Sequence, residues 1–249
     1  MAVSVKSHKV HHQDKDINSP DLPGAFELLK PSWQAISLNF ITLVEFIIIP
    51  IMLSLLSSIL TVHRLSNGMI ATNHGFTAQW YYLNGLSTGI SLLLAPGLSY
   101  TLLQGAKGQR IDFWPALKTG IKFFWRFLGV LICSGFLIIV GLILLIIPGL
   151  FMLRRYYLAP YYLLDRNLGV FETLRICKEE SVKCGNAVWS VLFAQILFVA
   201  ILIIPILGWI AGAILSVMYY NAPAIRYEQI TSSLKSKKGA KAASPATIH

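Results

Sequence analysis

Five apolar runs dominate this chain of 249 residues, and each is long enough, or nearly so, to cross a membrane. A helix rises 1.5 Å per residue, so a hydrocarbon core of about 30 Å needs about 20 apolar residues. The runs cover approximately residues 36–62, 80–103, 124–147, 187–204 and 208–226. A sixth run, at 150–164, is shorter and carries two arginines. Because 55% of the residues are apolar and only 13% are charged, the composition indicates a multispanning membrane protein.

Three Ala-Pro pairs, ending at Pro96, Pro160 and Pro223, indicate an internal repeat. Upstream of each pair, an aromatic residue is followed at the third position by leucine and at the fourth by a basic residue. The three sets are Phe26, Leu29 and Lys30; Trp114, Leu117 and Lys118; and Phe171, Leu174 and Arg175. Apolar runs match each other easily by chance, but the chain has only 11 prolines. The sequence therefore predicts an all-α membrane protein whose six transmembrane helices form three repeated helical hairpins.

The basic residues decide whether the short run at 150–164 spans the membrane. With six spans and an internal N-terminus, 18 of the 21 lysines and arginines lie on the cytoplasmic side. With five spans the basic tail would be external, against the positive-inside rule. The sequence therefore predicts a multi-pass protein of a cytoplasmic (plasma) membrane, with both termini in the cytoplasm and no cleaved signal peptide. Residues 1–24 are predicted to form a disordered head, 25–230 the membrane domain and 231–249 a disordered basic tail.

Prolines and glycines are predicted to shape the hairpins as kinks or turns, at Pro96, Pro148, Gly149, Pro160, Pro205 and Pro223. Residues 148–149 and 205 would form the tight external turns, and the three Ala-Pro prolines would kink the returning helices by removing a backbone hydrogen bond. Gly-x-x-x-Gly pairs beginning at Gly85 and Gly208 offer small surfaces for close helix packing within the bundle.

An interfacial amphipathic helix is predicted before each hairpin. Residues 112–123 and 169–184 are too short and charged to span, yet their apolar positions recur at helical spacing. Their bases are expected near anionic lipid head groups, and a docking face for a cytosolic protein is the alternative. The tail lysines expected to contact anionic lipid are Lys235, Lys237, Lys238 and Lys241.

Charged residues inside the apolar runs are the candidate site, because a charge at membrane depth is costly. Glu45 lies nine residues into the first span, about 13 Å deep at 1.5 Å per residue. Arg154 and Arg155 could reach it from a neighbouring helix. The hypotheses are a structural ion pair or a protonated, hydrogen-bonded Glu45, and alternatively a proton or cation relay.

The sequence contains none of the motifs that would predict catalysis. It has no phosphate-binding glycine loop, zinc-protease motif, nucleophile elbow or pair of catalytic carboxylates, and no soluble segment large enough for a catalytic domain. Neither a metal site nor a cofactor is predicted. The net charge of +10 follows the predicted topology and does not form one patch, so nucleic acid is not an expected partner.

A family resemblance covers roughly residues 105–230. The stretch from Leu144 to Gly149, followed by Arg154, the Ala-Pro pair at 159–160, and Gly185 with Trp189, resembles the membrane domain attached to some bacterial glycerophosphodiester phosphodiesterases and its stand-alone relatives. The resemblance implies a six-helix bundle in a prokaryotic cytoplasmic membrane. This chain has no phosphodiesterase barrel, so the hydrolase activity is not expected.

Two functions remain open from the sequence. The first is a non-enzymatic membrane module that organises lipids or partner proteins through its interfacial helices and basic tail. The alternative is a small transporter or lipid-translocating protein that uses a kinked-helix cavity near Glu45.

Overall fold

The computed structural model describes residues 22–66, 73–201 and 207–243, and these ranges consist of helices and short connections, without strands. The all-α prediction is confirmed for this part of the chain. The elements are η1 (Phe26–Leu28), α1 (Leu29–Leu38), α2 (Phe40–Ser66), α3 (Asn73–Ala106), α4 (Phe113–Leu144), α5 (Ile146–Tyr156), α6 (Ala159–Arg166), α7 (Val170–Lys183), α8 (Gly185–Ile201), α9 (Leu207–Met218) and α10 (Ala222–Ala243).

Three helices in the described ranges are long and apolar enough to cross a membrane. They contribute the segments Phe40–Ile59 of α2, Tyr81–Ala106 of α3 and Phe113–Leu144 of α4. A fourth candidate is the pair α7 and α8, which are bent by 96° at their junction. At 11 and 12 residues, α5 and α9 reach only about 16 to 18 Å at 1.5 Å per residue. The structure therefore gives three to four candidate spans, and the count of six stays a prediction.

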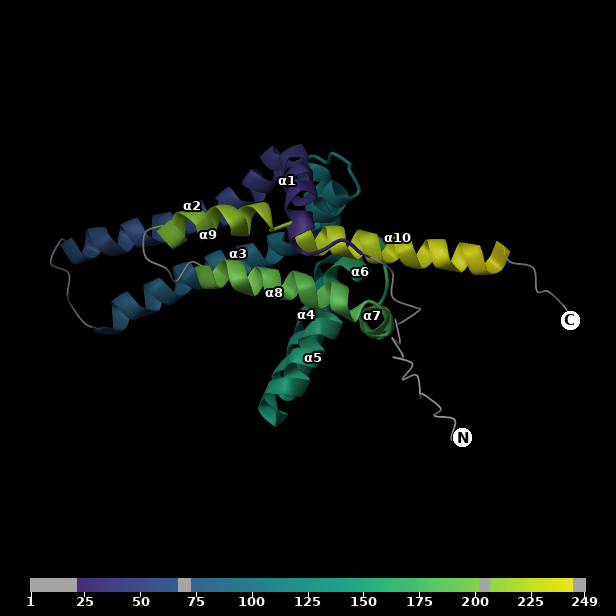
Figure 1. Cartoon of the computed structure of the whole chain (residues 1–249). Helices are drawn as coiled ribbons and strands as arrows, with labels where there is room; N and C mark the ends of the chain where they lie inside the picture. Colours follow the sequence, from purple (N-terminus) through teal and green to yellow (C-terminus); the bar gives the residue numbers. More distant parts are fainter. Residues whose placement is uncertain (1–21, 67–72, 202–206, 244–249) are drawn as a thin grey trace, which may run out of the picture.

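Consecutive helices pack in pairs that project from a common centre. α2 packs on α3, α4 on α5, and α8 on α9, and we call these pairs the three arms. In Figure 1 the α2–α3 and α8–α9 arms extend to the left of the centre, whereas the α4–α5 arm points downward. α10 runs out of the centre on the opposite side.

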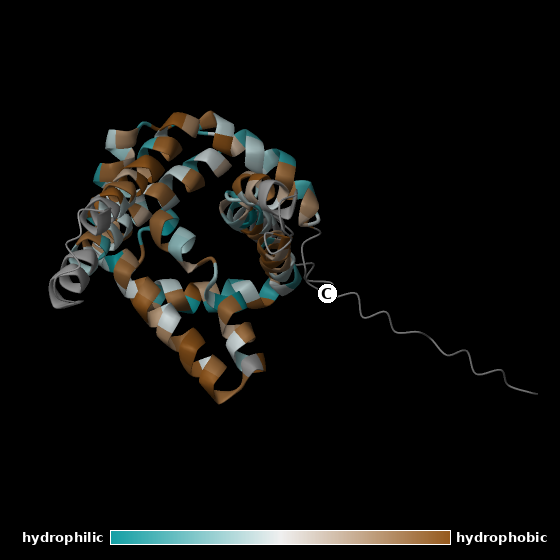
Figure 2. Cartoon of the chain, turned by 90° about the vertical axis from the view of Figure 1, so that its left-hand side faces the viewer, coloured by the Kyte–Doolittle hydropathy of each residue, from teal (hydrophilic) through white to brown (hydrophobic). Residues whose placement is uncertain are grey.

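The arms expose apolar side chains along much of their length. Ile59 on α2, Ile143 on α4 and Val199 on α8 are 64%, 79% and 59% exposed. Figure 2 shows the α4–α5 arm, at the bottom of the view, as largely hydrophobic. Soluble proteins rarely expose apolar surface on this scale, whereas lipid covers it without cost. In lipid the backbone must satisfy its own hydrogen bonds, which is why such runs become helices.

Most of the buried core lies where the arms converge. The largest apolar cluster joins the C-terminal end of α3 and the middle of α4 with α6, α7 and the first half of α10. Leu163 on α6 and Tyr227 on α10 are fully buried in it. The tertiary structure is therefore concentrated at one end of the arms.

The run at 150–164 and the last run are each split into two helices close to an Ala-Pro pair. α5 ends at Tyr156, whose carbonyl would need an N–H that Pro160 lacks, and α6 begins at the Ala-Pro pair. The last run breaks in a similar way. α9 ends at Met218, and the carbonyl of the next residue, Tyr219, would need an N–H that Pro223 lacks. These two prolines therefore begin new helices and do not kink continuous ones.

The other predicted kinks and turns differ in part from the structure. Pro96 lies inside α3, which continues through it. The turn between α4 and α5 is made by Leu145, in extended conformation at φ −166° and ψ 142°. Pro148 and Gly149 lie within the first turn of α5, where an absent N–H removes no intrahelical bond. Pro205 lies outside the described residues.

The structure confirms one of the two predicted amphipathic helices as a separate helix and corrects the other. A helix at 169–184 is confirmed as α7. The segment 112–123 is not a separate helix, because it continues without a break into the apolar part of α4. Only Pro115 could interrupt it, and this residue lies in the first turn, where proline is tolerated.

The basic tail, predicted to be disordered from residue 231, is helical as far as Ala243. Thr231 is buried, and Leu234 packs against the main apolar core, so α10 is anchored beyond the predicted boundary. Alanine and lysine, both good helix formers, then extend it. The four tail lysines, at 235, 237, 238 and 241, lie on this helix.

Candidate functional site

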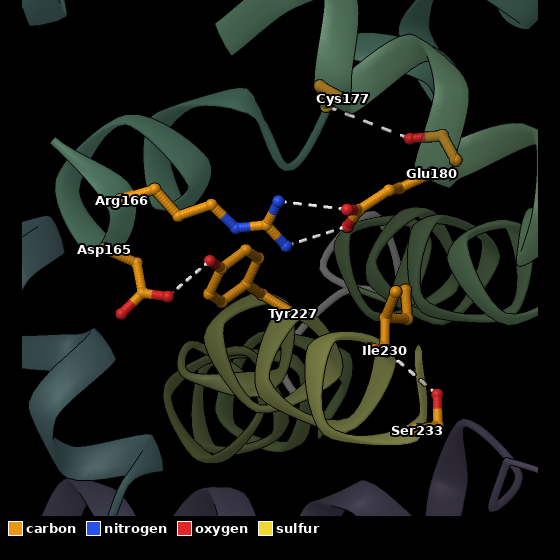
Figure 3. Close-up of polar contacts among 8 residues, drawn as sticks. Asp165, Arg166, Cys177, Glu180, Tyr227, Ile230 and Ser233 are labelled. Carbon is orange, nitrogen blue, oxygen red and sulfur yellow. Dashed lines mark hydrogen bonds and ion pairs between the residues drawn. The ribbon is translucent and has the colours of Figure 1, made fainter. Parts of the chain in front are cut away.

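Charged and aromatic side chains from four elements meet at the end of α6, and Figure 3 shows those of Asp165, Arg166, Glu180 and Tyr227. We call this cluster the hub; it comprises Lys107, Tyr162, Asp165, Arg166, Glu180 and Tyr227. α6 stops here because Asn167 adopts the left-handed conformation at φ 50°, which asparagine tolerates better than most residues. The last two residues of α6 are about 100° apart around the helix, so they reach different neighbours.

Arg166 joins α6 to α7 through a two-pronged ion pair. Its Nη1 and Nη2 atoms donate to the two carboxylate oxygens of Glu180, each at 3.0 Å. The guanidinium also stacks over the ring of Tyr162, 5.1 Å from the ring centre. The side chains of Arg166 and Glu180 are 28% and 13% exposed, so solvent screens the pair only partly. A planar guanidinium matched to a carboxylate in this way fixes direction as well as distance.

Asp165 joins α6 to α10 and to the end of α3. The hydroxyl of Tyr227 donates a hydrogen bond of 2.6 Å to Oδ2 of Asp165, and Lys107 forms an ion pair with Oδ1. Burial opposes ionisation of Asp165, but the hydrogen bonds from Lys107 and Tyr227 outweigh it and lower the pKa of this carboxyl. The ring of Tyr227 meets that of Tyr162 edge-on, with centres 4.7 Å apart. Asp165 and Arg166 thus connect segments that are far apart in sequence.

Replacing Tyr227 by phenylalanine should lower the free energy of unfolding by about 1.5 to 3 kcal/mol at pH 7, because a hydrogen bond to a charged carboxylate is lost. A carboxyl whose pKa is depressed by folding stabilises the protein fully above its unfolded pKa of about 3.9, and this contribution is lost as the pH falls through the folded pKa. The difference between Tyr227→Phe and the wild type should therefore shrink below about pH 4. Thermal unfolding in detergent at several pH values measures it.

Tyr161→Phe is the matched control. Tyr161 lies on α6, is buried like Tyr227, and stacks on its ring. Unlike the Tyr227 hydroxyl, the Tyr161 hydroxyl donates no hydrogen bond in the described part of the chain. An equal loss of stability in the two variants, constant with pH, would contradict the role assigned to the Asp165 contact.

The break between α5 and α6 is held by side chains of α7. Because α5 ends at Tyr156, the carbonyl of Arg155 has no regular helical partner. The Cys177 thiol and the Ser181 hydroxyl donate to this carbonyl, at 3.0 and 3.1 Å. The Cys177 side chain is fully buried, so its thiol is shielded from solvent.

Arg226, at the start of α10, links the N-terminal segment to the same region. Its side chain is fully buried, and Nη2 donates to the carbonyl of Pro23 at 2.9 Å and to the hydroxyl of Ser190 at 3.4 Å. Nη1 contacts Gln229 at 3.2 Å. This arginine therefore ties the start of the described chain to α8 and α10.

The structure does not bring Glu45 together with Arg154 and Arg155. Glu45 is exposed near the start of α2, which packs on α3, whereas the arginines end α5, which packs on α4, α7 and α8. The Arg154 guanidinium lies 5.2 Å from the ring centre of Phe151 and borders Gly185 at the start of α8. No ion pair joins Glu45 to Arg154 or Arg155 in the structure, and the role predicted for these three residues stays a prediction.

The segment between α3 and α4 explains where Glu45 lies. Asn39, at the corner between α1 and α2, donates to the carbonyl of Gln109 at 3.0 Å and accepts from the N–H of Ile111 at 2.8 Å. Thr42 donates to the carbonyl of Ile111 at 2.9 Å. These bonds hold residues 109–111 against the start of α2, beside Glu45.

The hub residues were not identified from the sequence. The only signal was that charges follow directly after the short run at 150–164, and it was used for topology alone. The hub links α6 to its neighbouring helices through ion pairs and hydrogen bonds. Among the described residues, no group of three or more His, Cys, Asp or Glu side chains is suited to a metal ion.

Comparison of the chain with protein-family models, with characterised proteins and with solved structures finds no match in any of the three. The resemblance to the membrane domain of glycerophosphodiester phosphodiesterases therefore stays a prediction.

Proposed function

We propose that this chain is a non-enzymatic, multi-pass membrane protein that organises lipids or partner proteins around a rigid hub. The observation that carries the proposal is the separation of surfaces: exposed apolar side chains cover the arms, while ion pairs and buried tyrosines gather where the arms meet. Such a molecule is suited to embedding its arms in lipid and presenting the hub side to the membrane surface.

We further propose that the arms are three copies of one hairpin. Asn39, between α1 and α2, lies the same number of residues after Phe26 as Cys184, between α7 and α8, lies after Phe171. The two corner residues have nearly the same backbone angles, φ −115° and ψ 26° at Asn39 and φ −118° and ψ 29° at Cys184. This agreement supports a common ancestor for the first and third units, with the corner straightened in α4.

The proposed topology places the hub and α10 in the cytoplasm and the turn between α4 and α5 outside. A cysteine introduced by Leu145→Cys should react with an impermeant thiol reagent added to intact cells, because Leu145 forms the exposed tip of that arm. A cysteine introduced by Ser236→Cys on α10 should react only after the cells are opened.

The wild type, with its own three cysteines, is the control. External labelling at residue 236 would contradict the cytoplasmic tail. A tip at residue 145 that stays protected in intact cells would show that the short α5 does not reach the far surface, and the count of six spans would then be wrong.

The transporter alternative depends on a cavity at Glu45. Glu45 does line a pocket, but the other lining residues come from α1, α2, the segment before α4 and its first residues. The lining residues lie only around the start of α2 and the start of α4, so this pocket does not run along the length of the arms. Its position at the start of α2 favours a lipid-organising role over a path across the membrane.

A further inference from the structure

Charged side chains of both signs line a pocket of about 240 Å³ beside the start of α2. Glu45 on α2, and Arg110 and Asp112 just before α4, supply the charges. All three residues are exposed, and no ion pair or hydrogen bond joins any two of them. Trp114, 68% exposed, borders the same pocket. Two carboxylates and one guanidinium are thus close together and available to a ligand.

The pocket is held in shape before any ligand arrives. The Asn39 amide binds the main chain at residues 109 and 111, and the Thr42 hydroxyl binds the carbonyl at 111. Asn39 and Thr42 are buried and also line the pocket. The segment that carries Arg110 and Asp112 is therefore fixed against α2, which lowers the cost of ordering a binding site.

We propose that this pocket binds the head group of an aminophospholipid of the phosphatidylethanolamine type. The Arg110 guanidinium provides paired N–H donors for the phosphate. The carboxylates of Glu45 and Asp112 accept hydrogen bonds from the primary ammonium group. The inference rests on the proposed function, because it requires the start of α2 to lie at the membrane surface.

The depth of the pocket agrees with a head-group site. Glu45 lies five residues after Phe40, the first residue of α2, or about 8 Å along the helix at 1.5 Å per residue. The head-group region adds about 5 to 8 Å on each side of the hydrocarbon core. Ile41, which also lines the pocket and is exposed, offers apolar surface to the start of an acyl chain.

The charges distinguish this head group from other common ones. An anionic head group would meet two carboxylates and only one guanidinium, so its phosphate would be repelled overall. A choline head group has no N–H to donate to Glu45 or Asp112. Anionic lipids are better matched to the lysines of α10.

Native mass spectrometry of the full chain in detergent tests the proposal. Short-chain phosphatidylethanolamine, phosphatidylcholine and phosphatidylglycerol are offered at equal concentration, and the bound fraction of each is measured. The wild type should retain the ethanolamine lipid preferentially. Glu45→Gln and Arg110→Gln should each weaken its binding about tenfold, because each removes a charge-assisted hydrogen bond.

Glu179→Gln, which neutralises an exposed carboxylate on α7, is the matched control and should bind like the wild type. Equal retention of the ethanolamine and choline lipids, or a preference for phosphatidylglycerol that Arg110→Gln abolishes, would overturn the assignment. Glycerophosphoethanolamine that competes as well as the short-chain lipid would overturn it too, in favour of a soluble ligand.

Alkaline carbonate extraction of cell membranes separates the two proposals. A chain that is extracted as a peripheral protein would refute the proposed function, and with it the head-group site. A chain that stays in the membrane but shows no lipid preference would refute the head-group site alone.

Discussion

Replacing Glu180 by glutamine is expected to lower the free energy of unfolding by about 2 to 3 kcal/mol, because it leaves Arg166 without its counter-ion in a partly buried site. The loss is smaller than for a fully buried pair because 28% of the Arg166 side chain remains exposed. The pair fixes the last turn of α6 against α7, so thermal unfolding in detergent should report the loss directly.

A double-mutant cycle isolates the interaction. Arg166→Gln should also destabilise the protein, but combining it with Glu180→Gln should cost less than the sum of the single changes, since two neutral amides leave no unpaired charge. Glu179→Gln, at the exposed neighbouring position, should stay within about 0.5 kcal/mol of the wild type. Additive effects in the cycle would show that Arg166 and Glu180 stabilise the protein independently.

The sequence predicted the apolar parts of the fold well, for a simple physical reason. Runs of about 20 apolar residues can be placed from composition alone, and those at 36–62, 80–103 and 124–147 fall largely within α2, α3 and α4. Proline positions also indicated where the chain changes direction. They could not show whether a proline breaks a helix, as at Pro160, or lies inside one, as at Pro96, because that depends on the packing around it.

The polar contacts were not predictable in the same way. Asp165 contacts Lys107 and Tyr227, which are 58 and 62 residues away along the chain. A single sequence contains no signal for such pairs. The depth predicted for Glu45 changes for a local reason. The first span was counted from Ile36, which places Glu45 nine residues into it. Because Asn39 interrupts the helix, α2 begins at Phe40, and Glu45 lies only five residues after its first residue.

The close contacts of glycines were likewise not predictable from the sequence. The sequence pointed to Gly85 and Gly89, yet a Cβ atom at either position would meet nothing within 4 Å. A close approach of α3 and α4 occurs instead between Gly97 and Gly120, which no short motif connects.

Gly120→Ala is therefore expected to destabilise the protein, although alanine favours a helix over glycine. A Cβ at Gly120 would lie 2.5 Å from the backbone nitrogen and 2.7 Å from the Cα of Gly97, so the clash is with main chain that cannot rotate away. α3 and α4 would have to separate where Phe46 of α2 also packs against Gly97. Overpacking of this kind costs about 1 to 3 kcal/mol, more than the gain of about 1 kcal/mol in helix propensity.

Gly135→Ala tests whether the effect comes from the contact and not from the substitution itself. Gly135 lies on the same helix, but a Cβ there would meet nothing within 4 Å, so only the gain in helix propensity of about 1 kcal/mol remains. The melting temperature in detergent should thus fall for Gly120→Ala and hold or rise for Gly135→Ala. Gly120→Val should lower it further, since a larger side chain pushes α3 farther away. If Gly120→Ala and Gly135→Ala instead shift the melting temperature equally, α3 and α4 do not meet at Gly97 and Gly120, and the centre from which the arms project is arranged differently.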